Sequence, residues 1–178
     1  HCSVRRQRQM CIRDSYQSGG FSEAEKLAAS ITQEFPKHPF AWKVLGAVLG
    51  ATGRKLEALD ANQTAASLSP QDAEAHYNLG NVLQEVGRLE EAEASLNQAI
   101  ALKPDRAEAH NNLGVTLQDL GRLEEAVASY NQLIALKPDY AEAHSNLGNT
   151  LQDLGRLDEA EASYSPVSYT HLRAHETG

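Results

Sequence analysis

Apolar residues recur along the middle of this chain at the spacing of an α-helix. Leu113, Leu117 and Leu120 form one stripe, and a second stripe runs from Leu123 to Ile134. Residues three and four positions apart lie on the same face of a helix. The pattern therefore predicts two amphipathic helices that follow each other closely, each with one face turned toward a core.

This pair of stripes returns with a period of 34 residues. Gly80, Gly114 and Gly148 hold one position of the repeat, and Pro104 and Pro138 hold another. A fixed period of this length is typical of helix–turn–helix repeats that stack into a solenoid. A single helix pair leaves part of its apolar stripes uncovered, so each repeat needs a neighbour.

Glycine and proline predict where these helices end and where they approach each other. Gly121 follows the first stripe and should end its helix, and Pro138 should end the second. Asp105 with Glu108 resembles a capping box and predicts that a helix begins there. Gly114 lies inside a helix, where glycine costs about 1 kcal/mol relative to alanine. Its recurrence predicts that a second helix packs closely against this position.

The repeat resembles the tetratricopeptide repeat (TPR) family in a near-consensus, bacterial-type form. In the copy 107–140, the family's signature positions fall on His110, Leu113, Gly114, Leu117, Gly121, Ala126, Tyr130, Leu133 and Pro138. The resemblance implies an all-α fold, a right-handed TPR superhelical solenoid of stacked antiparallel helix pairs with roughly four repeats. Two positions depart from the family pattern, because His110 replaces the usual tryptophan and Leu133 replaces a small residue.

The repeat frame divides the chain into repeats and flanks. Residues 16–38 are the second half of a truncated repeat, 39–72 a degenerate repeat, 73–106 and 107–140 full repeats, and 141–165 a truncated repeat. The flanks 1–15 and 166–178 do not continue the helical period, and both resemble translated sequencing-adapter sequence. We therefore expect both flanks to be non-native tails and leave them out of the fold prediction.

The chain is acidic and lacks long apolar runs. Its formal net charge of −8 argues against nucleic acid as a partner. No apolar run approaches the roughly 18–20 residues of a membrane span, so no membrane partner is expected. Cys2 and Cys11 both fall in the adapter-like flank and give no evidence about the redox compartment. The sequence leaves the compartment open and favours the cytoplasm.

The resemblance also implies which face of the solenoid binds a partner. In the family, positions 2, 5, 6, 9, 12 and 13 of each repeat face inward and form a concave groove. The predicted peptide-binding residues on this face are Asn78, Asn112, Asn146, Asn81, Asn149, Tyr77, Asn111, Gln84, Gln118 and Gln152. Because an amide is both donor and acceptor, Asn78, Asn112 and Asn146 predict a ladder that clamps the backbone of an extended peptide. The other interpretation is that these asparagines are solvated polar residues of a consensus-like repeat.

Histidines and paired carboxylates also recur with the repeat. His76, His110 and His144 stand where the family places a core aromatic residue. Stacked helices should hold them roughly 8–10 Å apart, too far to share one zinc ion. Pairs such as Glu124 and Glu125 begin second helices, where negative charge is stabilised by the helix dipole. We therefore predict no metal site, no cofactor and no catalytic residue in this chain.

These observations leave functions from different classes open. We predict a protein–protein interaction scaffold that binds an extended peptide or partner segment in the concave groove. The alternative is the substrate-recognition arm of a larger enzyme, such as a glycosyltransferase or sulfotransferase, whose catalytic domain lies outside this chain. A similar asparagine ladder occurs in the repeat arm of O-linked N-acetylglucosamine transferases. A third interpretation is a regular solenoid with only an assembly role. A chaperone-type clamp for carboxylates is disfavoured, because Lys43 is the only basic residue on the predicted groove.

The last repeat predicts self-association. Leu147, Leu151 and Leu154 would pack against a further repeat, and the adapter-like tail stands in its place. We expect this uncapped surface to pair with a second copy of the chain.

Overall fold

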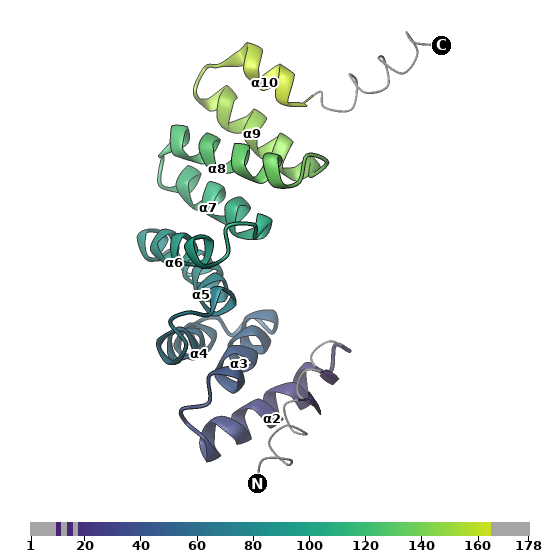
Figure 1. Cartoon of the computed structure of the whole chain (residues 1–178), viewed down its shortest axis with the longest axis vertical. Coiled ribbons are helices and arrows are strands. Elements are labelled where there is room, and N and C mark those ends of the chain that lie inside the picture. The colour runs from purple at the N-terminus through teal and green to yellow at the C-terminus, as the bar shows by residue number, and fades with distance from the viewer. Residues whose placement is uncertain (1–9, 12–13, 16–17, 165–178) are drawn as a thin grey trace, which may run out of the picture. The chain divides into compact units, whose positions relative to one another are not determined.

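The computed structural model describes residues 10–11, 14–15 and 18–164. The adapter-like flank 166–178 lies outside the described residues, and so does most of the flank 1–15. Within the described part the regular secondary structure is helical, which confirms the all-α prediction. The helices are α2 (Phe21–Glu34), α3 (Pro39–Ala51), α4 (Lys55–Leu68), α5 (Ala73–Glu85), α6 (Leu89–Leu102), α7 (Ala107–Asp119), α8 (Leu123–Leu136), α9 (Ala141–Asp153) and α10 (Leu157–Tyr164) (Figure 1).

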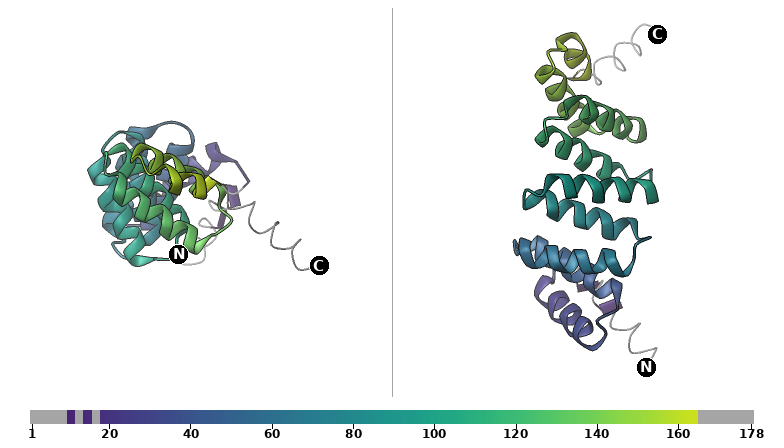
Figure 2. Two further views of the ribbon diagram at one scale, coloured as in Figure 1. Left: turned by 90° about the horizontal axis from the view of Figure 1, so that it is seen from above. Right: turned by 90° about the vertical axis from the view of Figure 1, so that its left-hand side faces the viewer.

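The chain divides into two compact units, and the boundary follows Leu102. The first unit contains α2 to α6, and the second contains α7 to α10. In each unit, helices that are consecutive in the chain pack against each other, and the strongest packing joins α3 to α4, α5 to α6 and α7 to α8. Figure 2 shows these pairs as antiparallel helices that follow one another in layers within their unit. Antiparallel packing follows because the turns that join the paired helices are short.

The core of the first unit is built from small and medium apolar residues. Alanines of α4 and α5 pack beneath Trp42 and Leu79. Leu49, Val82 and Leu83 form the larger neighbouring cluster together with alanines of α4 and α6. Alanine allows helix backbones to approach closely, while the longer side chains fill the spaces between them.

In the second unit, the leucines of α9 are covered by their own unit. Leu147 and Leu151 are 7% and 3% exposed, although the sequence predicted that they would lack a covering neighbour. That expectation is wrong for these two residues, because α9 packs against both α8 and α10. The most exposed large apolar side chain among the described residues of this unit is Leu157 of α10, at 64%.

Glycine ends the first helix of each described pair, as predicted. Gly121 follows the last residue of α7 by two positions and has a φ of 74°, in the left-handed region that favours glycine. The predicted capping box is wrong. Arg106, not Asp105, stands at the N-cap of α7, and no side chain caps that position. In contrast, Asp72 caps α5, because its carboxylate accepts from the backbone N–H groups of residues 74 and 75.

The predicted close approach at the helical glycines is confirmed. A Cβ placed on Gly114 would lie 2.5 Å from the ring of Tyr130, and one placed on Gly80 would lie 2.7 Å from Leu96. Such separations are shorter than non-bonded carbon atoms tolerate. The second helix of each pair therefore lays a large side chain directly against a glycine of the first.

Candidate functional site

The predicted groove residues of the first unit lie on α3 and α5. On α3, Lys43 is mostly buried and its Nζ contacts Asp72 Oδ2 at 2.9 Å and Glu74 Oε2 at 2.6 Å. Burial acts to lower the pKa of Lys43, but the hydrogen bonds to Glu74 and Asp72 outweigh it and raise the pKa. The one basic residue of this face is therefore neutralised by two carboxylates of its own chain. This arrangement leaves no uncompensated positive charge on it for a carboxylate ligand.

The side of this face formed by α5 is rich in amides. Tyr77, Asn78, Asn81 and Gln84 are all partly buried there. On α3, Gly50 has open space where a side chain would be. The first unit therefore presents a row of polar side chains on α5.

In the second unit, Asn111 links α7 to α9. Its side chain is buried, with 8% exposure, and its Nδ2 donates to Glu142 Oε1 at 3.4 Å. Asn146 of α9 donates through Nδ2 to Asn111 Oδ1, also at 3.4 Å. The structure therefore brings Asn146 together with Asn111. The ladder of Asn78, Asn112 and Asn146 stays a prediction.

Two tyrosines hold further groove amides in place. The ring of Tyr130 is fully buried, and its hydroxyl donates to Gln118 Oε1. The hydroxyl of Tyr164 donates to Asn149 Oδ1 at 2.6 Å. The partners differ because α7 has Val115 at the position of Asn149, and a valine side chain accepts no hydrogen bond.

These tyrosine contacts were missed by the sequence reasoning, although Tyr130 and Tyr164 are one repeat apart. In both pairs the tyrosine hydroxyl donates to the amide oxygen, so the N–H₂ group of the same amide remains as a donor for a ligand. Burial raises the pKa of Tyr130, and the negative charges of Asp119 and Glu142 add to the effect. The phenol therefore stays protonated and keeps donating to Gln118 at neutral pH.

The recurrent histidines bind the backbone. The Nε2 atoms of His76, His110 and His144 lie 3.1, 2.9 and 2.8 Å from the carbonyl oxygens of Pro70, Pro104 and Pro138, respectively. Since a carbonyl oxygen only accepts, each Nε2 carries the proton. Trp42 makes the same bond, from Nε1 to the carbonyl oxygen of Pro36 at 2.7 Å. Histidine therefore replaces tryptophan in this family position by keeping a ring N–H at the same place.

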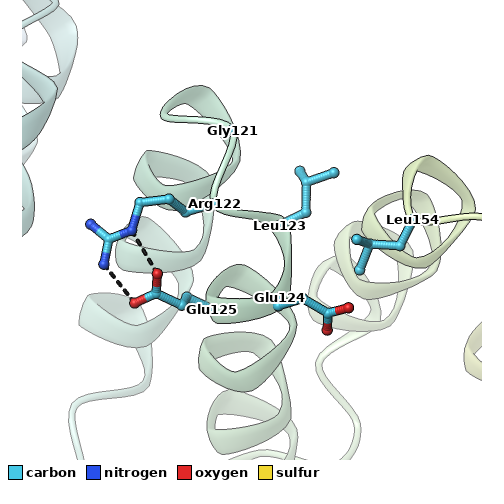
Figure 3. Close-up of a pocket in the computed structure, with 6 residues that line it drawn as sticks. All are labelled: Gly121, Arg122, Leu123, Glu124, Glu125 and Leu154. Carbon is cyan, nitrogen blue, oxygen red and sulfur yellow. Dashed lines mark hydrogen bonds and ion pairs between the residues drawn. The ribbon is translucent and has the colours of Figure 1, made fainter.

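The paired carboxylates at the starts of second helices are used in ion pairs. Arg122 binds Glu125 through two contacts, Nε to Oε1 at 2.7 Å and Nη2 to Oε2 at 2.5 Å. The hydrogen bond from Arg122 lowers the pKa of Glu125. A small pocket of about 260 Å³ lies beside this pair, and Figure 3 shows Glu124 and Leu154 on its other side. The same Arg–Glu pairing recurs at Arg54, Arg88 and Arg156, so it belongs to the repeat itself.

The described part of the chain offers neither a cluster of metal ligands nor a membrane-spanning helix. It holds no group of three or more histidine, cysteine or acidic residues that could bind a metal ion. No helix within it has both the length and the apolar character that crossing a bilayer requires.

Comparison with known proteins identifies the family. The sequence pattern described as TPR repeat matches residues 46–87, 85–121 and 116–155, which together span more than half of the chain. The chain therefore belongs to the TPR repeat family, as the sequence predicted. No curated protein matches it.

Solved structures support the same fold. A crystal structure of MamA matches with a TM-score of 0.84 at 22% identity, and the match covers 96% of each chain. MamA 41-end from Desulfovibrio magneticus RS-1 matches with a TM-score of 0.83 at 19% identity, covering 97% of each chain. YrrB, described as a TPR protein with an unusual peptide-binding site, matches with a TM-score of 0.77 at 20% identity, covering 93% of this chain and 88% of YrrB.

Proposed function

We propose that this protein is an interaction scaffold that binds an extended peptide across the amide-rich faces of its first helices. In the second unit this face lies on α7 and α9. The observation that carries the proposal is the tyrosine-held amide: Tyr130 with Gln118 and Tyr164 with Asn149. Each amide keeps its N–H₂ group as a donor, and the carbonyl groups of an extended peptide are the matching acceptors.

Pre-organisation is what favours binding by these amides over simple solvation. A side chain that is already fixed by a protein partner loses less rotamer freedom when a ligand binds. The buried link between Asn111 and Asn146 fixes a further pair in the same way. The described peptide-binding site of YrrB is consistent with this use of a similar fold.

Charge favours a polar or basic peptide over an acidic one. Asp119 and Glu142 act on the same region, because both raise the pKa of Tyr130. In the first unit, Lys43 is neutralised by Asp72 and Glu74. An acidic ligand would therefore meet like charge on the face of α7 and α9, and it would find no uncompensated positive charge at Lys43 in the first unit.

The proposal is tested with a displayed library of random dodecapeptides selected on the full chain. The affinity of the selected peptide is then measured by calorimetry for the double variant Asn112→Ala/Asn146→Ala and for Tyr130→Phe. We expect the double variant to lose at least about tenfold in affinity, which corresponds to about 1.4 kcal/mol. Tyr130→Phe should show a smaller loss, because only the orientation of Gln118 is relaxed.

Asn131→Ala is the matched control, since Asn131 is an exposed asparagine on α8 and not among the groove residues. It should bind like the parent. Equal binding by all variants would refute the proposal.

The alternative of a recognition arm on a larger enzyme stays a prediction, and so does self-association through the last repeat. Sequencing the gene on both sides of the codons for 16–164 tests the first of these. It shows whether the repeats continue into a catalytic domain and whether the adapter-like flanks are encoded.

A further inference from the structure

A trough of about 670 Å³ lies on the first unit between α4 and α6, with α5 at its floor. We call it the α4–α6 trough. Its lining includes Gln63, Ala66 and Ser67 of α4, Leu79 of α5, and Ala94 and Gln98 of α6. None of these residues belongs to the amide-rich face of the proposed function. Its volume falls within the range of small-ligand pockets, roughly 300–1,000 Å³.

The trough lies beside a position where α4 has a small residue and the two following repeats have a large one. Ala66 of α4 corresponds in the repeat frame to Ile100 of α6 and Ile134 of α8. Leu79 corresponds to Leu147 of α9. Leu147 is buried, whereas Leu79 is partly exposed at the floor of the trough.

The equivalent position in the second unit shows which side chain the first unit lacks. There, α8 supplies an isoleucine, α9 supplies the leucine and α10 completes the layer. In the first unit, Ala66 lacks three carbon atoms relative to that isoleucine, so the space beside Leu79 is left to solvent. An aliphatic side chain from another molecule would restore the same apolar contact, worth roughly 25 cal/mol for each Å² of apolar surface buried.

The polar residues of the trough restrict what can surround that side chain. Gln63 and Gln98 stand on opposite helices, and Ser67 and Ser95 add hydroxyl groups. His76 also lines the trough, and its Nε2 is already bonded to the carbonyl oxygen of Pro70. No carboxylate, lysine or arginine is among the described residues that line the trough. A charged neighbour in the ligand would lose hydration there without gaining a partner, whereas uncharged polar groups can bond with the two amides.

We infer that the α4–α6 trough is a second docking site, which binds a partner segment carrying one isoleucine- or leucine-sized side chain between uncharged polar residues. A second copy of this chain does not fit this description. Its exposed leucines in the described residues are Leu56, Leu136 and Leu157, and each has a charged residue on at least one side.

The test uses the full chain labelled with ¹⁵N and three capped pentapeptides of sequence SQIQS, SQAQS and SQEQS. In amide chemical-shift titrations, we expect the isoleucine peptide to shift the signals of Ser67, Leu79 and Ala94. A dissociation constant of roughly 10 mM is expected for a single aliphatic anchor of this kind. The alanine and glutamate peptides should bind at least about tenfold more weakly.

Two variants of the protein assign the binding to the trough. Ala66→Ile fills it with the chain's own isoleucine and should abolish the shifts without lowering the melting temperature. Ser67→Glu places a charge on an exposed position of the lining and should also abolish them. Ala128→Ile adds the same side chain at an exposed position of α8 and should bind like the parent.

The inference is overturned if the isoleucine peptide shifts no trough amide, or if the folded Ala66→Ile protein binds it unchanged. Shifts confined to the amides of α7 and α9 would also overturn it, while supporting the separate proposal for that face. Binding at the trough is independent of Asn112 and Asn146, so the double variant of the proposed function should leave these titrations unchanged.

Discussion

Residue 62 shows how one side chain can break the regularity of a repeat. Asn62 stands where the later repeats have Leu96, Tyr130 and Tyr164. It is 2% exposed, packs against Gly46, and its Oδ1 has no hydrogen-bond partner. A buried acceptor without a donor costs roughly 1–3 kcal/mol. The degenerate repeat therefore carries a local weakness at its own packing centre.

Replacing this residue should stabilise the protein. We expect Asn62→Leu to raise the free energy of unfolding by about 1–3 kcal/mol, because it removes the unpaired oxygen and restores the leucine–glycine contact seen at Leu96 and Gly80. Urea unfolding followed by circular dichroism measures the change. The reverse control, Leu96→Asn, should lower stability by at least about 2 kcal/mol. A less stable Asn62→Leu protein would show that Asn62 has a partner in solution.

At the scale of the element, each first helix is anchored by a ring N–H. His76, His110 and His144 bind the carbonyl oxygen six residues earlier, and Trp42 does the same in the degenerate repeat. The bond fixes the first turn of the helix to the proline-containing turn before it. This position therefore sets the direction in which the chain enters each first helix, and an aromatic ring without a donor would not replace it.

The anchor can be tested at α7. His110→Phe keeps a buried aromatic ring but leaves the Pro104 carbonyl oxygen without its donor, so we expect a loss of about 1 kcal/mol in the free energy of unfolding. His110→Trp should recover most of that loss, since Trp42 makes the equivalent bond with its indole N–H. Thermal and urea unfolding of the three proteins provide the comparison. If phenylalanine and tryptophan are equally tolerated, the hydrogen bond is not what the position requires.

At the scale of the whole molecule, carboxylates form ion pairs with lysines in both units. In the first unit, burial acts to raise the pKa of Asp72, but the hydrogen bond from Lys43, its charge and two backbone N–H groups lower the pKa overall. In the second unit, the hydrogen bond from Lys137 lowers the pKa of Glu108. Because of these pairs, the free energy of unfolding should depend on pH under acidic conditions.

The sign of this dependence follows from proton binding. Carboxyls with a lowered pKa in the folded state bind fewer protons there than in the unfolded state, so their stabilisation is present above the unfolded pKa, about 4. We expect unfolding free energies to change little between about pH 8 and 5 and to fall steadily below about pH 4. Lys43→Met should weaken that fall, because Asp72 loses the partner that lowers its pKa, whereas Lys103→Met should not. An unchanged profile for Lys43→Met would contradict this account.

The sequence alone predicted the helix pairs, their period and the close approach at Gly114. These follow from local chemistry and from a pattern that recurs, so several copies report the same constraint. The capping box was also predicted from local spacing, and that prediction was wrong. Asp105 and Glu108 have the right spacing for a capping box, but the helix begins one residue later. Only the folded backbone shows which residue is the N-cap.

The tertiary structure decided which polar groups meet. Asn146 lies 35 residues after Asn111 in the chain, and the packing of α9 beside α7 brings the two amides together. Tyr130 binds Gln118 because Val115 offers no acceptor one turn earlier. The α4–α6 trough is likewise lined by residues of three packed helices, among them Ala66, Leu79 and Ala94. Spacing along the chain sets which residues share a face, whereas side-chain volume and reach across helices set which of them touch.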